Sequence, residues 1–336
     1  MNFSPMKRNY EVISNLTPSL RYDGRSDFYE WQTKAKEKLA ELLGMHRYEK
    51  CDPEFNIEYR KETDEYIEYR FTIQSEPGYY FPSVLRVPLG FEEGKHPFIL
   101  CLQGHSNGMH LSLGEPKFPG DDVKINSGDR DFCVRAVKEG YIALALEQRC
   151  FGECNGKDEP GINCFDSTMR AILTGRTTIG ERVWDCSRAL DAVLEHFDFI
   201  DEDKICIMGN SGGGTATYYA GCLDERFKLV MPSCAVCSWD MSIAALRHCS
   251  CNYVPSIANY FDMGDIGGII APRMLVVVHG VTDNYFYKPG VDKSYELIKS
   301  AYDAAGVPDN CVLVTGPEGH RFYADLAWTE VKRLMN

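Results

Sequence analysis

Among the serines of this sequence, the one best suited to act in catalysis lies among glycines. Ser211 falls within CIMGNSGGGTATYYAG, residues 206–221, directly after an apolar run. The pentapeptide GNSGG at 209–213 fits the pattern G-x-S-x-G, in which a strand turns sharply into a helix and leaves the serine hydroxyl exposed. Such a turn could also be purely structural or bind phosphate, but the lysine of a Walker loop is missing after the glycines. We therefore interpret Ser211 as a candidate nucleophile.

A serine nucleophile needs a base, and the base needs an acid that orients it. Two downstream residues follow strand-like runs in the required order: RMLVVVHGVTD ends on Asp283, and CVLVTGPEGH ends on His320. His320 could take the proton of Ser211 while Asp283 orients its ring and stabilises the imidazolium. Asp240, after the preceding apolar run, is the rival acid, and Asp283 could also be an ordinary turn aspartate.

Backbone N–H groups near the serine could form an oxyanion hole. The N–H of Gly212 would face a developing oxyanion at the start of the helix. The loop after PFILCLQG would supply a second donor, the N–H of His105, with Gly104 allowing close approach. The side chain of His105 is expected only to fill the pocket wall.

The order of apolar runs indicates which elements position these residues. After residue 96, short runs that are apolar throughout alternate with helical stretches, which is typical of a mostly parallel sheet with helices on both faces. Before this point, 26–44 has helical spacing, and the next stretches alternate apolar and polar residues as antiparallel strands do. We predict one α/β domain over 1–336, with residues 1–75 as a helical and hairpin extension.

Four stretches together resemble a known family. They are LQGH at 102–105, GNSGG at 209–213, IAPRMLVVVHGVTD at 270–283 and GPEGHRFY at 316–323. On these residues the chain resembles the dienelactone hydrolase and acetyl xylan esterase-like branch of the α/β-hydrolases, over about residues 80–336.

The resemblance implies an α/β-hydrolase fold and a definite set of roles. Ser211 would be the nucleophile, Asp283 the acid and His320 the base, with Gly212 and His105 as oxyanion donors. Gln103 departs from the pattern, since many relatives carry His before the glycine. A dienelactone hydrolase proper uses Cys as its nucleophile, so the serine at 211 favours an enzyme that acts on ester substrates.

The segment 237–268 is too long for a simple connection between a helix and a strand, and it is rich in aromatic and small polar residues. It would lie over the carboxyl edge of the sheet, so we predict an insertion that covers the pocket. An ordinary helix and loop is the alternative. The candidate substrate contacts in this segment are Trp239, His248, Asn252 and Tyr253.

Charge and hydropathy exclude several classes of function. The formal net charge is −13 at pH 7, which argues against nucleic acid and anionic membrane surfaces as partners. No apolar run reaches the roughly 18 residues of a membrane helix, and the first residues lack the apolar core of a signal peptide. We expect a cytoplasmic protein.

The 14 cysteines fit reduced structural thiols better than disulfides, since no export signal precedes them. Three groupings contain possible metal ligands: Cys150 with Cys154, Cys234 with Cys237, and His248 with Cys249 and Cys251. None has the paired spacing of a zinc finger. We therefore expect no metal and no cofactor.

These patterns predict a serine carboxylic-ester hydrolase that works through an acyl-enzyme. Its expected substrate is a small-molecule or carbohydrate ester, with a short acyl group such as acetyl on a sugar or similar alcohol. A serine peptidase of the prolyl-oligopeptidase kind shares the triad, although the sequence shows no propeller-sized segment before it. A non-catalytic binding module is the third possibility, against which all three triad positions are filled.

Overall fold

The computed structural model describes residues 3–159 and 161–335. Within these ranges nine strands form one sheet, in the order β1-β2-β3-β5-β4-β6-β7-β8-β9. Their bounds are β1 (Asn56–Glu62), β2 (Tyr66–Glu76), β3 (Tyr79–Pro88), β4 (His96–Leu102), β5 (Ile142–Leu146), β6 (Ile200–Asn210), β7 (Leu229–Ser233), β8 (Met274–Gly280) and β9 (Cys311–Gly316).

The sheet has a parallel half and an antiparallel half. Strands β4 to β9 pair in parallel, whereas β1, β2 and β3 form an antiparallel meander that joins the sheet through β3 and β5. Strand β5, of sequence IALAL, is buried at every position, while every residue of the edge strand β1 is exposed. Parallel strands are covered on both faces and are therefore apolar throughout.

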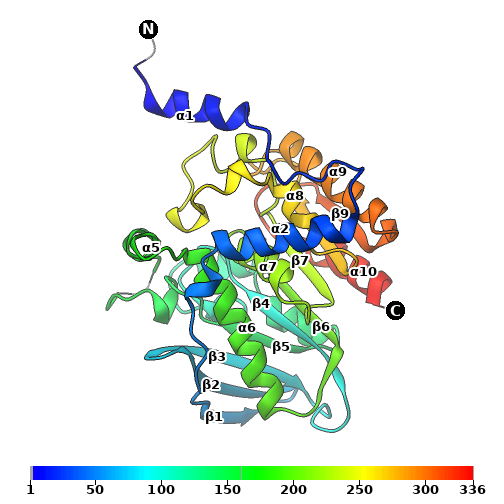
Figure 1. Ribbon diagram of the computed structural model, residues 1–336. Helices are drawn as coiled ribbons and strands as arrows, with labels where there is room; N and C mark the ends of the chain where they lie inside the picture. The colour runs from blue at the N-terminus through cyan, green and yellow to red at the C-terminus, as the bar shows by residue number, and fades with distance from the viewer. Residues whose placement is uncertain (1–2, 160, 336) are drawn as a thin grey trace.

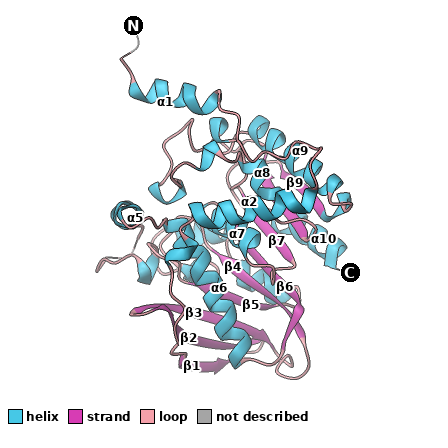
Figure 2. Ribbon diagram, viewed as in Figure 1, coloured by secondary structure: helices cyan, strands magenta, loops and turns pink. Residues whose placement is uncertain are grey.

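Helices cover both faces of the sheet (Figures 1 and 2). One face packs against residues of α2, α6, α7, α8 and α9, and the other against residues of α4 and α10. The helix bounds are α1 (Pro5–Ser14), α2 (Phe28–Leu42), α3 (Asp121–Gly128), α4 (Phe132–Lys138), α5 (Cys164–Leu173), α6 (Thr178–His196), α7 (Gly212–Leu223), α8 (Met263–Gly268), α9 (Lys288–Ala304) and α10 (Ala324–Met335).

The helix expected over 26–44 is α2. Its first turn is capped by Asp27, whose carboxylate accepts the N–H groups of Tyr29 and Glu30. Just beyond its end, Gly44 adopts φ 76°, a left-handed conformation that stops a helix at little cost. Helix α1 was not predicted: it has no buried residue and extends from the body of the molecule in Figure 1.

The predicted fold class is confirmed: a mostly parallel sheet with helices on both faces, preceded by a helix and an antiparallel hairpin. The hairpin is part of a three-stranded meander, because β3 continues into the sheet beside β5. The limits proposed for the extension and the insertion stay predictions. In the described ranges no helix combines the length and apolarity that a bilayer crossing demands.

Candidate active site

Ser211 occupies the turn between β6 and α7. Its φ of 56° and ψ of −122° are unusual for a residue with a Cβ, and such backbone strain tends to collect at functional sites. The turn is held on both sides, since the N–H of Ser211 donates to the carbonyl of Ser233 at 2.8 Å and its carbonyl accepts the N–H of Thr215 at 2.8 Å. Strand, strained serine and helix form the elbow that the pattern predicts.

The glycines of the elbow permit close backbone contact. A Cβ on Gly213 would lie 2.2 Å from the carbonyl oxygen of Leu102 in β4, and one on Gly209 would lie 2.5 Å from that of Gly213. Real Cβ atoms do not approach backbone this closely, so side chains here would push the helix away from the sheet. The helix start is therefore fixed against the ends of β4 and β6.

His320 and Asp283 form a hydrogen-bonded pair. Nδ1 of His320 lies 2.8 Å from Oδ2 of Asp283, and each residue lies in the loop after its strand, β9 and β8 respectively. The other carboxylate oxygen accepts the N–H groups of Tyr285 at 2.8 Å and Phe286 at 3.3 Å. Burial by itself raises the pKa of Asp283, but the bond to His320 and its charge outweigh burial, so the pKa of Asp283 is lowered.

A cavity of about 300 Å³ brings the serine and the histidine together. Its described lining residues are His105, Arg130, Ser211, Gly212, Thr215, Arg247, His248, Cys249, Asn252, Tyr285, Phe286 and His320. Asp283 is buried and reaches the cavity through His320. The rival acid lies elsewhere: a carboxylate oxygen of Asp240 is 3.4 Å from the ammonium of Lys293.

The loop after β4 lies directly beside the elbow. An added Cβ on Gly212 would fall 2.8 Å from both Cε1 and Nδ1 of His105, so the imidazole packs on the backbone of Gly212. The side chain of Gln103, the departure from the family pattern, donates to Ser112 Oγ and to the Arg130 carbonyl, both at 2.7 Å. These two hydrogen bonds tie the loop after β4 to Ser112 and Arg130.

Two of the four predicted substrate contacts line the cavity, His248 and Asn252. Burial lowers the pKa of His248 and favours its neutral ring, and its Nε2 is buried with no hydrogen-bond partner among the described residues. A neutral imidazole can donate or accept through this nitrogen, depending on the tautomer.

The other two predicted contacts, Trp239 and Tyr253, are not among the described residues that line the cavity. The indole of Trp239 is buried in the main core, where its N–H donates to the Phe261 carbonyl at 2.6 Å. Tyr253 is 43% exposed, and its hydroxyl donates to the Ile243 carbonyl at 3.2 Å. Both side chains stabilise the segment 237–268 itself and do not line the cavity.

Sequence reasoning missed two arginines of the cavity wall, Arg130 and Arg247. Burial lowers the pKa of Arg130, and its Nε has no hydrogen-bond partner among the described residues. Arginine is always charged at neutral pH, so both guanidinium groups contribute positive charge near the serine. No local pattern in the sequence marked either residue, because each enters the cavity from a loop.

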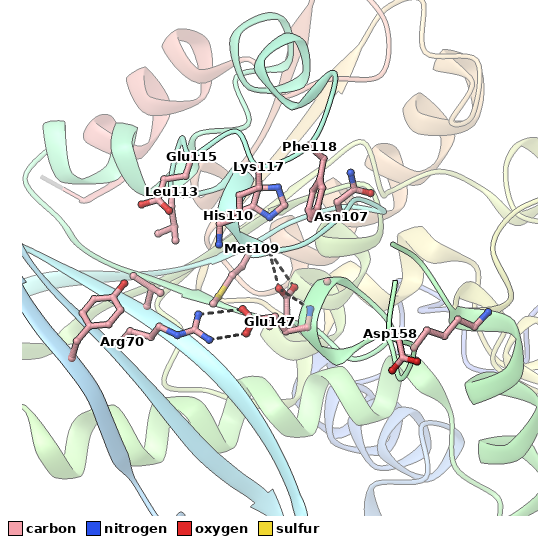
Figure 3. Close-up of a pocket in the computed structure, with 15 residues that line it drawn as sticks. Arg70, Asn107, Met109, His110, Leu113, Glu115, Lys117, Phe118, Glu147 and Asp158 are labelled. Atoms are coloured by element: carbon pink, nitrogen blue, oxygen red, sulfur yellow. Dashed lines mark hydrogen bonds and ion pairs between the residues drawn. The ribbon is translucent and has the colours of Figure 1, made fainter. Parts of the chain in front are cut away.

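A larger cavity of about 580 Å³ lies apart from the serine and surrounds Glu147, the residue after β5 (Figure 3). The carboxylate accepts the N–H of Met109 at 3.1 Å. Glycines make room for it, since a Cβ on Gly108 or Gly152 would lie 2.7 or 2.3 Å from its Oε2. Burial raises the pKa of Glu147 from 4.5 to about 8, against the smaller effect of this hydrogen bond.

Glu147 should make the protein less stable as pH rises. Between the ordinary pKa of 4.5 and the folded value of about 8, the native protein retains a proton that the unfolded chain has lost. Its contribution to the free energy of unfolding therefore declines with rising pH across that window. Glu147→Gln cannot titrate, so the variant should gain stability relative to the wild type from pH 5 to pH 8.

Urea denaturation at several pH values across this window measures the difference. Glu202→Gln provides the matched control, because Glu202 is exposed and the substitution removes a carboxylate from the surface only. Parallel pH profiles for Glu147→Gln and wild type would contradict the interpretation.

The elbow after β6, the aspartate after β8 and the histidine after β9, on a mostly parallel sheet, define the α/β-hydrolase fold. The sequence profile of the prolyl oligopeptidase family matches residues 175–324. A protein of Bacillus subtilis (strain 168), YtaP, whose name assigns it provisionally to the hydrolases, is 29% identical over 231 residues, which are 68% of this chain and 74% of YtaP.

Solved structures agree on the fold. A Bacteroides fragilis NCTC 9343 protein, described provisionally as an acetyl xylan esterase, superposes with a TM-score of 0.78 at 18% identity over 99% of this chain and 90% of its own. A glucuronoyl esterase from Solibacter usitatus has a TM-score of 0.67 at 16% identity over 95% and 96% of the two chains. The resemblance inferred from the sequence is confirmed.

Proposed function

We propose that this protein hydrolyses carboxylic esters through a covalent acyl-enzyme at Ser211. The observation that carries the proposal is the strained serine sharing one cavity with a histidine that a buried aspartate holds at 2.8 Å. Such an arrangement activates a hydroxyl that is otherwise a weak nucleophile.

The reaction would proceed in two halves. As Ser211 Oγ bonds to the ester carbonyl carbon, its proton passes to Nε2 of His320, and the oxyanion accepts the N–H groups of Gly212 and His105. When the intermediate collapses, the C–O bond to the alcohol breaks, and His320 returns the proton to the departing oxygen. Water then attacks the acyl group by the same path and releases the acid and the free serine. Asp283 stays ionised and stabilises the imidazolium.

The cavity favours a short acyl group. Its volume of about 300 Å³ lies at the small end of the range for ligand pockets. Among the described lining residues none carries a carboxylate, whereas Arg130 and Arg247 are cationic. An acetyl ester of a sugar fits this space, and the arginines favour an alcohol that bears an acidic group. The names of the structural relatives, which include carbohydrate esterases, support this choice.

A substrate series tests the proposal. Nitrophenyl acetate, butyrate and octanoate should show falling kcat/KM with acyl length, and acetylated xylo-oligosaccharides should release acetate. Turnover of octanoate equal to that of acetate would contradict the short-acyl assignment. Methyl esters of glucuronate, assayed in parallel, separate acetyl esters from esters of the sugar acid itself.

The match to the prolyl oligopeptidase family over 175–324 makes peptide hydrolysis the second candidate. The same serine, base and oxyanion donors cleave amides. Prolyl and alanyl nitroanilides distinguish the two, because an esterase should leave them uncleaved under conditions where nitrophenyl acetate turns over. Cleavage of the anilides with a higher kcat/KM than the acetate would favour the peptidase.

A further inference from the structure

Beside the proposed triad, the fold assembles a cluster of four side chains that can ligate a metal: His105, Cys164, Cys249 and Cys251. One ligand atom from each residue lies within 4.8 Å of all the others. The residues come from the loop after β4, the first residue of α5 and the η5 (Ser250–Asn252) region, so they are far apart in the chain. Such convergence of three thiols and one imidazole is a known donor set for structural zinc.

We propose that this cluster binds one zinc ion with Cys₃His ligation. In a tetrahedral site with Zn–S bonds of about 2.3 Å, neighbouring sulfurs lie about 3.8 Å apart, which is within the spacing found here. Nε2 of His105 already lies 3.1 Å from Sγ of Cys251, so this nitrogen faces the thiols. Four protein ligands fill the coordination sphere, which is typical of structural rather than catalytic zinc.

A buried arginine provides matching charge. Arg182 is 1% exposed, and its guanidinium lies 3.5 Å from Sγ of both Cys251 and Cys164. Its other hydrogen bonds go to the carbonyl of Arg149. Nearby Asp185 pairs with Arg149. Three thiolates around one zinc ion leave a net charge of −1, which the guanidinium would balance in this buried site.

The ligand set differs from the one considered from the sequence, His248 with Cys249 and Cys251. In the fold the ring of His248 packs against Tyr285 and Phe286 on the cavity wall. His105 takes its place as the histidine of the cluster. The proposal departs from the expectation that the protein needs no metal, and it does not depend on the proposed esterase activity.

The ion would connect the catalytic loops to the segment 237–268. The imidazole of His105 would bind zinc through Nε2 while its other edge packs on Gly212. Cys249 lines the cavity that contains Ser211. Zinc binding would therefore fix the loop after β4, and with it the backbone N–H of His105, in the position that the oxyanion hole requires.

Metal analysis of the purified full-length protein tests the site. Protein treated with chelator under reducing conditions and then dialysed against zinc should retain about one equivalent per chain. Cobalt in place of zinc should give the intense visible absorption of tetrahedral thiolate coordination. Failure to retain either ion in folded wild-type protein would overturn the proposal, as would a disulfide within the cluster after purification under reducing conditions.

Variants assign the ligands. Cys249→Ser combined with Cys251→Ser should lower zinc affinity at least about 100-fold and abolish the cobalt spectrum. Cys222→Ser is the matched control, since Cys222 is a buried thiol of α7 whose hydrogen bond goes to the Ile266 carbonyl, and it should retain both. Unchanged metal binding in the double variant would overturn the assignment. Because the wild-type spectrum is measured without mutation, misfolding of the variant leaves the test decisive.

Discussion

Ser211→Ala should lower kcat/KM for nitrophenyl acetate by about 10³-fold or more. The variant lacks the oxygen that bonds to the acyl carbon, so neither half of the reaction can pass through an acyl-enzyme. Alanine removes only the hydroxyl, and the hydrogen bonds that hold the turn use the backbone of residue 211. The fold should therefore survive, as circular dichroism and thermal unfolding would show.

A fluorophosphonate probe gives a second measure of the same residue. Wild-type protein should be labelled stoichiometrically and lose activity in proportion, and Ser211→Ala should remain unlabelled. Ser127→Ala, at an exposed position on α3, is the control and should label like the wild type. Full labelling of Ser211→Ala would assign the nucleophile to another residue. Absence of labelling in the wild type would favour the non-catalytic binding module.

Asp283→Asn should lower kcat by about 10³- to 10⁴-fold. An amide cannot stabilise the imidazolium, and its NH₂ group would favour the wrong tautomer of His320 when placed at 2.8 Å from Nδ1. The N–H groups of Tyr285 and Phe286 donate to the carboxylate of Asp283. In the variant, the amide oxygen can still accept both hydrogen bonds. The loss should therefore fall on kcat and leave the free energy of unfolding little changed.

Asp240→Asn is the matched control for the acid. Its carboxylate lies near Lys293 and not near His320, so kinetics of this variant should resemble the wild type. Equal losses in both variants would indicate a general electrostatic effect, and a loss in Asp240→Asn alone would move the acid to that position. Steady-state kinetics on one ester substrate decides among these results.

The elbow and the hydrogen-bonded pair of Asp283 and His320 could be predicted from the sequence because their signals are local. Ser211 is flanked by glycines typical of a tight turn, and Asp283 and His320 each follow an apolar run of strand length. The order of such runs also predicted the parallel half of the sheet. Helix α1 was missed because none of its residues is buried, and only Ile13 packs against the main core.

The wall of the cavity was harder to predict because irregular backbone has no period. Between 237 and 262 the chain forms only short 3₁₀ turns, so an aromatic residue there can point into the core, as Trp239 does, or outward, as Tyr253 does. The histidine of the thiol cluster was not predicted correctly for a different reason. Sequence proximity grouped His248 with the cysteines, whereas the histidine that reaches them, His105, is more than a hundred positions away.

The contact between His105 and Gly212 packs the two proposed oxyanion donors against each other. No side chain larger than hydrogen fits at 212 while the imidazole remains in place, so the ring of His105 and the backbone of Gly212 are in direct contact. The donors are thus ordered when the chain folds and not when a substrate arrives. Little reorganisation would then remain for the reaction itself, which is the condition under which fixed dipoles stabilise a developing charge most effectively. By the same reasoning, a bulkier residue at 212 could be tolerated only together with a smaller one at 105, and the two positions should vary as a pair.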